Sequence, residues 1–263
     1  MSAPKIDLMK TSVQNGVAVI SYDIPPANTL SKASNKALIE SFKWALSDSA
    51  VKVIVLTGEG KFFSTGLNLS DVPAQGPVLP DDHIELLREM HQIWINAEKV
   101  TIAAVNGPAV GYGTSSIALF DLVYSVPDSF FFTPFVKVGL CAEACASVTF
   151  RNSMGRQKAS ALILGGERFT PQELENAGLI TKILPKEGFM DEVLKIAKRI
   201  AEQPAGALRD NKNLLMAPLR QELLDANERE CEMLRQRGKT DEPRKAIEQF
   251  AKEQAAKKKK AKL

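Results

Sequence analysis

Hydrophobic positions change their spacing several times along the first sixty residues. Two apolar segments, 5–11 and 17–22, flank Gln14-Asn15-Gly16, a spacing typical of a β-hairpin with a glycine at its turn. After Ser31, a plausible N-cap, apolar residues recur at helical spacing to about residue 49. The continuous apolar segment 53–57 then predicts a strand buried on both faces. This order of elements predicts an α/β fold with a buried parallel strand.

The remaining chain continues this alternation and then becomes mostly helical. A helix is expected at 83–97, with strands at 101–105, 122–125, 130–133 and 180–184. Further helices are expected at 142–153, 156–164, 171–177, 189–202, 205–216, 219–236 and 242–256. The Pro- and Gly-containing segment 58–80 is long for a loop in a compact domain, which predicts that it covers a ligand. We therefore divide the chain into a core (1–200), a C-terminal helical region (201–256) and a basic tail (257–263).

Composition and charge exclude several classes of protein. With 263 residues, 44% hydrophobic and 25% charged, the chain suits one large domain or a domain with an appendage. Net charge is +3, and five positive charges lie in the last seven residues, so no general nucleic-acid-binding surface is predicted. Three cysteines and the absence of a charged-then-apolar start predict a reducing compartment. No apolar segment approaches the roughly 20 residues that span a bilayer.

Candidate chemistry is concentrated between residues 105 and 143. Gly111 and Gly113 flank Tyr112 where a helix could begin, and such a turn leaves backbone N–H groups available to an oxyanion. Glu143 is the only carboxylate between residues 129 and 151. Glu143 is either a catalytic acid or base in an apolar setting, or an N-terminal acid favoured by the dipole of a helix starting near Ala142. The two interpretations are compatible.

Four motifs in a fixed order resemble those of the crotonase (enoyl-CoA hydratase/isomerase) superfamily. They are Val53-Ile-Val-Leu-Thr-Gly with Phe62-Phe-Ser-Thr-Gly66-Leu67, Ala104-Val-Asn-Gly-Pro-Ala-Val-Gly111-Tyr112-Gly113, Phe120-Asp-Leu-Val-Tyr124, and Phe132-Thr-Pro-Phe-Val-Lys-Val-Gly-Leu-Cys-Ala-Glu143. The resemblance covers nearly the whole chain. It implies a crotonase-type ββα spiral core followed by a C-terminal helical region.

The resemblance also implies catalytic roles. The backbone N–H groups of Leu67 and Tyr112 match the family's oxyanion hole, which binds the developing enolate oxygen of an acyl-CoA thioester. Hydratases of the family carry two glutamates, and the matching positions here are Ser115 and Phe135. Glu143 falls instead where peroxisomal-type Δ3,Δ2-enoyl-CoA isomerases carry a single catalytic glutamate. We therefore expect such an isomerase, acting in β-oxidation of unsaturated fatty acids.

Substrate binding is expected around the same loops. The residues in question are Ser64, Gly66, Leu67, Gly111 and Phe135, with Lys32 and Lys61 as candidates for the coenzyme A phosphates from loop position alone. No cofactor is expected, because coenzyme A is part of the substrate. No metal site is expected, since His83 and His91 lack an evident third ligand.

The sequence also leads to expectations about the oligomeric state of the protein and its location in the cell. The leucines of segments 205–216 and 219–236 predict apolar faces, and by resemblance a homotrimer or a dimer of trimers. Ala261-Lys262-Leu263 resembles the C-terminal Ser-Lys-Leu address, which predicts recognition by the peroxisomal import receptor. The alternatives are another crotonase-fold enzyme, either a dienoyl-CoA isomerase or a hydratase, and a non-catalytic acyl-CoA-binding scaffold whose lysine tail contacts nucleic acid or an acidic partner.

Overall fold

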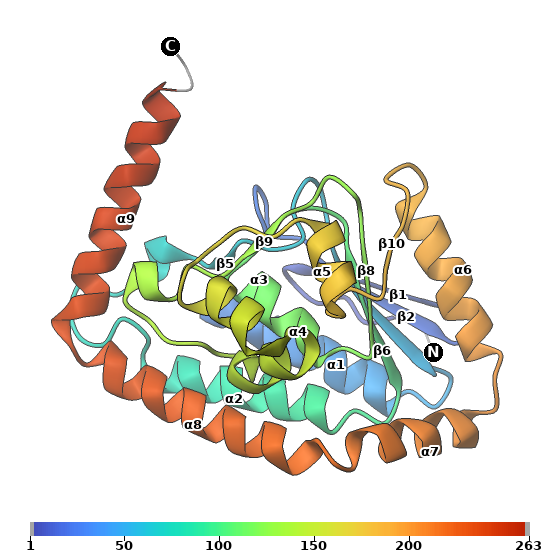
Figure 1. Cartoon of the computed structure of the whole chain (residues 1–263). Coiled ribbons are helices and arrows are strands. Elements are labelled where there is room, and N and C mark those ends of the chain that lie inside the picture. The colour runs from blue at the N-terminus through green and yellow to red at the C-terminus, as the bar shows by residue number, and fades with distance from the viewer. Residues whose placement is uncertain (1–2, 261–263) are drawn as a thin grey trace.

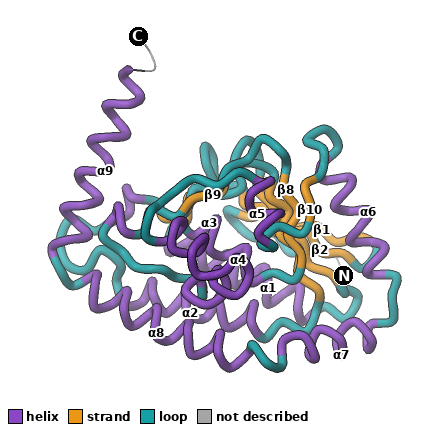
Figure 2. Tube along the Cα trace, viewed as in Figure 1, coloured by secondary structure: helices purple, strands orange, loops and turns teal. Residues whose placement is uncertain are grey.

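A six-stranded sheet forms the centre of the computed structural model, which describes residues 3–260, with side chains placed for residues 3–253. The strands are β1 Met9–Gln14, β2 Val17–Tyr22, β4 Val53–Gly58, β6 Val100–Val105, β8 Leu122–Ser125 and β10 Lys182–Ile183. They lie in the order β1-β2-β4-β6-β8-β10, and all neighbours are parallel except β1 and β2. Figure 2 shows the strands grouped together with helices around them. Every residue of β4 is buried, which explains its unbroken apolar sequence.

Two small parallel sheets lie beyond the ends of these strands and bring two loops together. β3 Thr29–Leu30 pairs with β5 Gly66–Leu67, and β7 Ala109–Val110 pairs with β9 Phe131–Phe132. A further bridge joins Ser64 to Ala109. Short helical segments follow these strands: η1 Leu69–Asp71, α3 Tyr112–Ser115, η2 Ser116–Leu119 and η3 Val136–Val138. The turn after β4 therefore lies directly beside the turn after β6.

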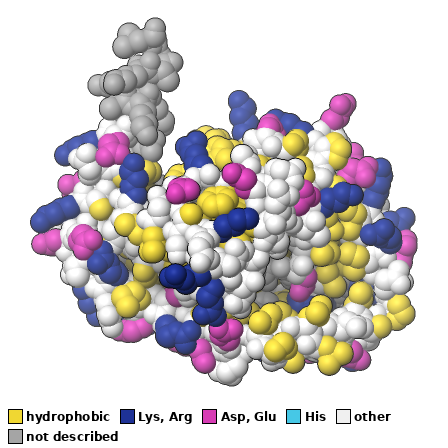
Figure 3. Space-filling model, in the orientation of Figure 1, with side chains coloured by type: hydrophobic (Ala, Val, Ile, Leu, Met, Phe, Trp, Pro, Cys, Tyr) yellow, Lys and Arg dark blue, Asp and Glu magenta, His cyan; other side chains and the backbone are white. Residues whose placement is uncertain are grey.

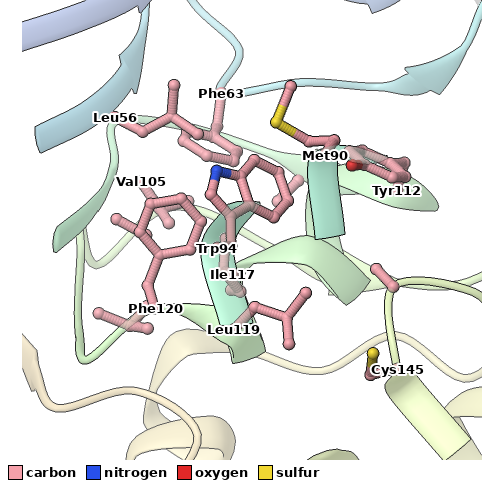
Figure 4. Close-up of a cluster of buried hydrophobic side chains, with 14 of the residues drawn as sticks. Leu56, Phe63, Met90, Trp94, Val105, Tyr112, Ile117, Leu119, Phe120 and Cys145 are labelled. Atoms are coloured by element: carbon pink, nitrogen blue, oxygen red, sulfur yellow. The ribbon is translucent and has the colours of Figure 1, made fainter. Parts of the chain in front are cut away.

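Helices cover both faces of the main sheet (Figure 1). On one side lie α1 Lys32–Ser47 and α2 Asp81–Ile95, with α8 Arg220–Gly238 packed on α2. The core on this side centres on Trp94, which lies beside Phe120 (Figure 4). The ring of Trp94 lies 5.2 Å from that of Phe120 and 5.6 Å from that of Phe42. On the other side, α6 Phe189–Ala201 packs on β2, β4 and β6 in a second apolar cluster.

The remaining helices surround this core and run to the end of the described chain. They are α4 Ala146–Ile163, α5 Pro171–Ala177, α7 Ala205–Met216 and α9 Asp241–Lys260. α7 and α8 run along one edge of the molecule, and α9 projects from it (Figure 1). Within residues 3–260, no helix has the length and apolar character needed to cross a membrane.

Several predicted boundaries are wrong for physical reasons. The first strand spans Met9–Gln14 rather than 5–11, because the turn at Asn15 and Gly16 pairs Gln14 directly with Val17. The break expected between the helices 142–153 and 156–164 is confirmed, because the non-helical Gly155 (φ 76°, ψ 160°) kinks the chain within α4. α4 begins at Ala146 rather than Ala142, because Ala144 and Cys145 have positive φ. Glu143 therefore precedes the helix instead of capping it.

Two helix boundaries were predicted from local signals: the N-cap at Ser31 and the end of the last helix at residue 256. The Ser31 cap is confirmed: its hydroxyl accepts the Ser34 N–H in a capping box. The last helix was expected to end at residue 256 but continues to Lys260, so the backbone of residues 257–260 is helical. The predicted address Ala261-Lys262-Leu263 lies outside the described residues.

Candidate active site

A cavity of about 130 Å³ lies where the two loops meet the segment before α4. Leu67 comes from β5, Gly111 and Tyr112 come from the start of α3, and Phe135 and Glu143 come from the segment between β9 and α4. These five predicted site residues therefore line one cavity. The wall is apolar apart from Asn35, Thr65, His83, Tyr112, Cys141 and Glu143.

Glycine is required where the two loops touch. Gly66 has φ +73°, and a Cβ there would lie 2.8 Å from the Val110 carbonyl oxygen and 3.1 Å from the Tyr112 nitrogen. A Cβ on Gly113 would likewise lie 2.5 Å from the Ser64 carbonyl oxygen. No other residue type allows this approach without displacing backbone. The close contact places the backbone of Leu67 and that of Tyr112 at the same side of the cavity.

The backbone N–H groups of Leu67 and Tyr112 are oriented by β5 and α3, the elements in which these residues lie. The Asn68 N–H donates to the Leu30 carbonyl (2.8 Å), and successive groups along a strand point to opposite sides, so the Leu67 N–H points away from β3. Tyr112 is the first residue of α3, where N–H groups lack intrahelical acceptors. Two such donors can stabilise negative charge that develops on a bound oxygen.

Glu143 is the buried acid of the cavity, with 8% of its surface exposed. Its Oε1 accepts a hydrogen bond from the Ser115 hydroxyl, and among the described residues its buried Oε2 has no partner. Burial raises the pKa of Glu143 to about 8; the Ser115 hydrogen bond opposes this shift, and the charge of Glu230 adds to it. A carboxyl group in this setting can both take up and return a proton near neutral pH.

Ser115 and Phe135, the positions expected to match hydratase glutamates, make other contacts in this structure. Ser115 is fully buried and donates to Glu143, so it orients the acid. Phe135 is 5% exposed and forms part of the apolar cavity wall. Neither side chain can accept a proton from water at neutral pH.

The other predicted binding residues lie outside the cavity lining. The Ser64 hydroxyl donates to the Asn28 carbonyl (2.8 Å) and accepts the Gly66 N–H (3.2 Å), so this side chain fixes the turn. Lys32 forms an ion pair with Asp82 at the surface, and Lys61 is exposed in the loop after β4. Contact of either lysine with coenzyme A phosphates stays a prediction.

Sequence reasoning missed Glu230, a second buried carboxylate near Glu143. Glu230 comes from α8, is 7% exposed, and accepts the backbone N–H groups of Cys145 (2.7 Å) and Ser147 (2.9 Å). The helical spacing of the buried positions Leu223, Ala226, Asn227, Glu230, Cys231 and Leu234 was the available signal. A charged residue on such an apolar face needs specific partners.

Sequence reasoning also missed a series of buried polar contacts that ends at the Tyr112 hydroxyl group. Asn227 Oδ1 lies 2.8 Å from His91 Nδ1, and His91 Nε2 lies 3.1 Å from the Tyr112 hydroxyl oxygen. Burial lowers the pKa of His91 to about 4, so its ring is neutral, donating from Nδ1 and accepting the Tyr112 O–H at Nε2. His83 similarly pairs with Asn35 (3.0 Å). In the described part of the chain, no group of three or more His, Cys, Asp or Glu side chains could hold a metal ion.

The six-stranded sheet with its two small parallel sheets, the paired glycine turns and the buried acid together define an α/β protein of crotonase type. The chain belongs to the enoyl-CoA hydratase/isomerase family, whose model, described as "Enoyl-CoA hydratase/isomerase", matches residues 12–260. The fold class predicted from the sequence is thereby confirmed.

Known proteins with similar sequences include two named as isomerases. The chain is 33% identical to human "Enoyl-CoA delta isomerase 2" over 90% of its own length, and spans 61% of that relative. It is 31% identical to mouse "Enoyl-CoA delta isomerase 3, peroxisomal" over 93% of its length, covering 78% of that protein. Among solved structures, an enoyl-CoA hydratase/isomerase from Pseudoalteromonas atlantica T6c superimposes with a TM-score of 0.86 at 25% identity, covering 94% of this chain and 98% of that one.

Proposed function

We propose that the protein is a Δ3,Δ2-enoyl-CoA isomerase. In this proposal the Leu67 and Tyr112 N–H groups bind the thioester oxygen, and Glu143 moves the proton. The observation that carries the proposal is the buried Glu143 carboxyl, whose raised pKa suits a proton shuttle at the cavity wall and whose Oε2 has no partner among the described residues. The two relatives named as delta isomerases support the same reaction.

The reaction needs only one carboxylate. Glu143 Oε2 takes a proton from the carbon next to the thioester carbonyl, the C–H bond breaks, and the electron pair delocalises onto the thioester oxygen. The two backbone donors stabilise that oxygen. The same carboxyl then returns the proton two carbons further along, so the double bond moves from position 3 to position 2 and no atom is gained or lost. The Ser115 hydrogen bond holds the carboxyl in place during both transfers.

Hydration of a double bond requires water activated between two carboxylates, and the site supports this less well. Glu230 does not line the cavity, and Ser115 and Phe135 hold the positions that by resemblance match the two hydratase glutamates. Hydratase and dienoyl-CoA isomerase activities are therefore the alternatives behind the first choice. A purely binding scaffold is disfavoured, because ionising an acid buried like Glu143 destabilises the fold and binding alone does not require it.

Assembly, location and cofactor use extend the proposal. The large apolar side chains Leu214 and Leu215 are 73% and 75% exposed, and hydrophobic side chains gather on the surface along α7 (Figure 3). Such a surface supports a homotrimer or a dimer of trimers, and a sedimentation mass of one chain would contradict it. The resemblance of Ala261-Lys262-Leu263 to the Ser-Lys-Leu address and the relative named as peroxisomal support a peroxisomal location. The proposed reaction is complete without a cofactor beyond the coenzyme A of the substrate.

The proposal is tested by incubating the purified full-length chain with a 3-enoyl-CoA and recording formation of the conjugated 2-enoyl thioester by absorbance. A parallel assay with a 2-enoyl-CoA measures loss of conjugation through hydration, and a 3,5-dienoyl-CoA tests the dienoyl reaction. We expect conjugation of the 3-enoyl-CoA to be fastest. Hydration or dienoyl isomerisation at a higher kcat/KM would replace the proposed reaction, and acyl-CoA binding without any turnover would favour the scaffold.

A further inference from the structure

The segment that carries Glu143 has an unusual backbone conformation. Ala144 and Cys145, which follow Glu143 directly, have φ values of 55° and 59° although neither is glycine. L-residues with a Cβ seldom adopt this left-handed conformation, and two in succession persist only when their surroundings hold them. Both residues are fully buried, so solvent does not hold this turn.

The Glu230 side chain binds the backbone of this turn through both of its oxygens. Its Oε2 accepts the Cys145 N–H at 2.7 Å, and its Oε1 accepts the Ser147 N–H at 2.9 Å. These two donors lie on either side of the start of α4, where backbone N–H groups lack intrahelical acceptors. The Cys145 thiol also donates to the Leu223 carbonyl of the same helix α8 (3.3 Å). The turn is therefore fixed from α8, a helix that lies far away in the sequence.

We propose that Glu230 is a positioning residue for the isomerase reaction: its carboxylate fixes the turn at Ala144 and Cys145, and thereby sets both the place and the electrostatic surroundings of the Glu143 carboxyl group. This inference rests on the proposed function, since the position of Glu143 matters for turnover only if Glu143 transfers the proton. Glu230 itself does not contact the reacting atoms in this scheme, because it is not among the residues that line the cavity.

The charges around Glu143 and Glu230 determine how the rate of isomerisation is expected to depend on pH. Glu230 faces Glu143 and Cys141 from the segment before α4, Cys145 and Ser147 at the start of α4, and Arg229 and Cys231 on its own helix. Glu143 faces Ser115 and Tyr112 on its other side. Because the negative charge of Glu230 raises the pKa of Glu143, removing that charge lowers the pKa of Glu143.

Two substitutions separate the charge of Glu230 from its hydrogen bonds. Glu230→Gln keeps the shape but offers one acceptor oxygen, and it places an NH₂ group against the other N–H. Glu230→Asp keeps the charge but shortens the side chain, so it cannot reach both donors. Glu232→Gln is the matched control, because Glu232 is an exposed glutamate on the same helix.

The experiment measures kcat, KM and the pH profile of isomerisation in the full-length protein, together with amide exchange of the 143–149 segment. Since misplacing a catalytic group by about 1 Å can cost roughly 10²-fold, we expect both Glu230 variants to lose 10- to 100-fold in kcat with KM changed less than about threefold. The half-maximal rate should move to lower pH in Glu230→Gln and stay at the wild-type pH in Glu230→Asp. Amide exchange of the 143–149 segment should accelerate in both variants, and the control should match wild type throughout.

The outcomes distinguish this inference from the proposed function. Wild-type kcat and pH profile in both Glu230 variants would overturn the positioning role, even if the protein is an isomerase. If the wild-type protein does not isomerise 3-enoyl-CoA, the proposed function fails, and amide exchange still decides whether Glu230 holds the turn. Unchanged exchange in both variants would overturn that role. If Glu230→Gln does not fold, Glu230→Asp still tests the positioning role through kcat and through amide exchange of the 143–149 segment.

Discussion

Replacing Glu143 with glutamine should remove activity and at the same time stabilise the protein at alkaline pH. Glutamine has the same shape, and its side-chain oxygen can still accept the Ser115 hydroxyl. It cannot shuttle a proton, and general acid–base transfer is worth roughly 10²–10⁴ in rate. We therefore expect isomerisation to fall by at least about 10²-fold while acyl-CoA binding persists.

The gain in stability follows from proton linkage. The pKa of Glu143 rises from 4.5 in the unfolded chain to about 8 in the folded protein, because burial penalises its charged form. Between these values the folded state holds more protons than the unfolded state, so the free energy of unfolding falls as pH rises from about 4.5 to about 8. Above this window the accumulated loss amounts to at most roughly 5 kcal/mol. Glutamine carries no charge, so the variant escapes this loss.

Urea unfolding at pH 5 and pH 9 tests the linkage, and the 3-enoyl-CoA assay tests the chemistry. Wild type and Glu143→Gln should have similar free energies of unfolding at pH 5, and the variant should be more stable at pH 9. Glu232→Gln, an exposed acid, should change neither stability nor rate. A variant with near-wild-type turnover would show that Glu143 is not the base, and equal stabilities at pH 9 would show that its ionisation is not penalised.

Other changes have equally specific expected results. In the wild-type enzyme, kcat/KM should rise with pH and level off above about 8, because the base must be ionised; a flat profile between pH 6 and 9 would contradict this. Ser115→Ala removes the hydrogen bond that lowers the pKa of Glu143, so the pH of half-maximal rate should move upward, whereas an unchanged profile would exclude this role. Gly66→Ala places a methyl group 2.8 Å from a backbone oxygen, so it should displace an oxyanion-hole donor and cost about 10²–10³ in kcat, as measured with the folded variant. A reporter carrying residues 257–263 should become punctate in cells and should stay diffuse when Ala261 to Leu263 are removed; diffuse fluorescence of the intact fusion would refute the peroxisomal address.

Local sequence signals were sufficient to predict much of the core and the loops that form the cavity. The apolar segment 53–57 became β4, and Ser31 caps α1, because both depend on residues within a few positions of one another. The glycine motifs identified Gly66 and Gly111, and the structure places the residues that follow them in the cavity wall. These features are determined by backbone conformation, which glycine and the hydrophobic pattern report directly.

Features that depend on distant contacts could not be predicted in this way. The start of α4 was placed too early, because the left-handed turn before it is held by Glu230, which lies 85 residues beyond Cys145. The link between His91 and Asn227 joins residues 136 positions apart. No periodicity indicates which buried polar groups will meet across such distances. For the same reason no role was predicted for Glu230.

The position of α8 in the chain has a consequence for biosynthesis. Proteins are made from the N-terminus at about 5–20 residues per second, so the cavity residues from Leu67 to Glu143 leave the ribosome well before α8. Until Asn227 and Glu230 arrive, the nascent chain lacks the groups that hold Tyr112 and the turn after Glu143. We therefore expect the site to reach its final geometry only when synthesis is nearly complete, so that released chains lacking α8 fold in part but do not turn over substrate.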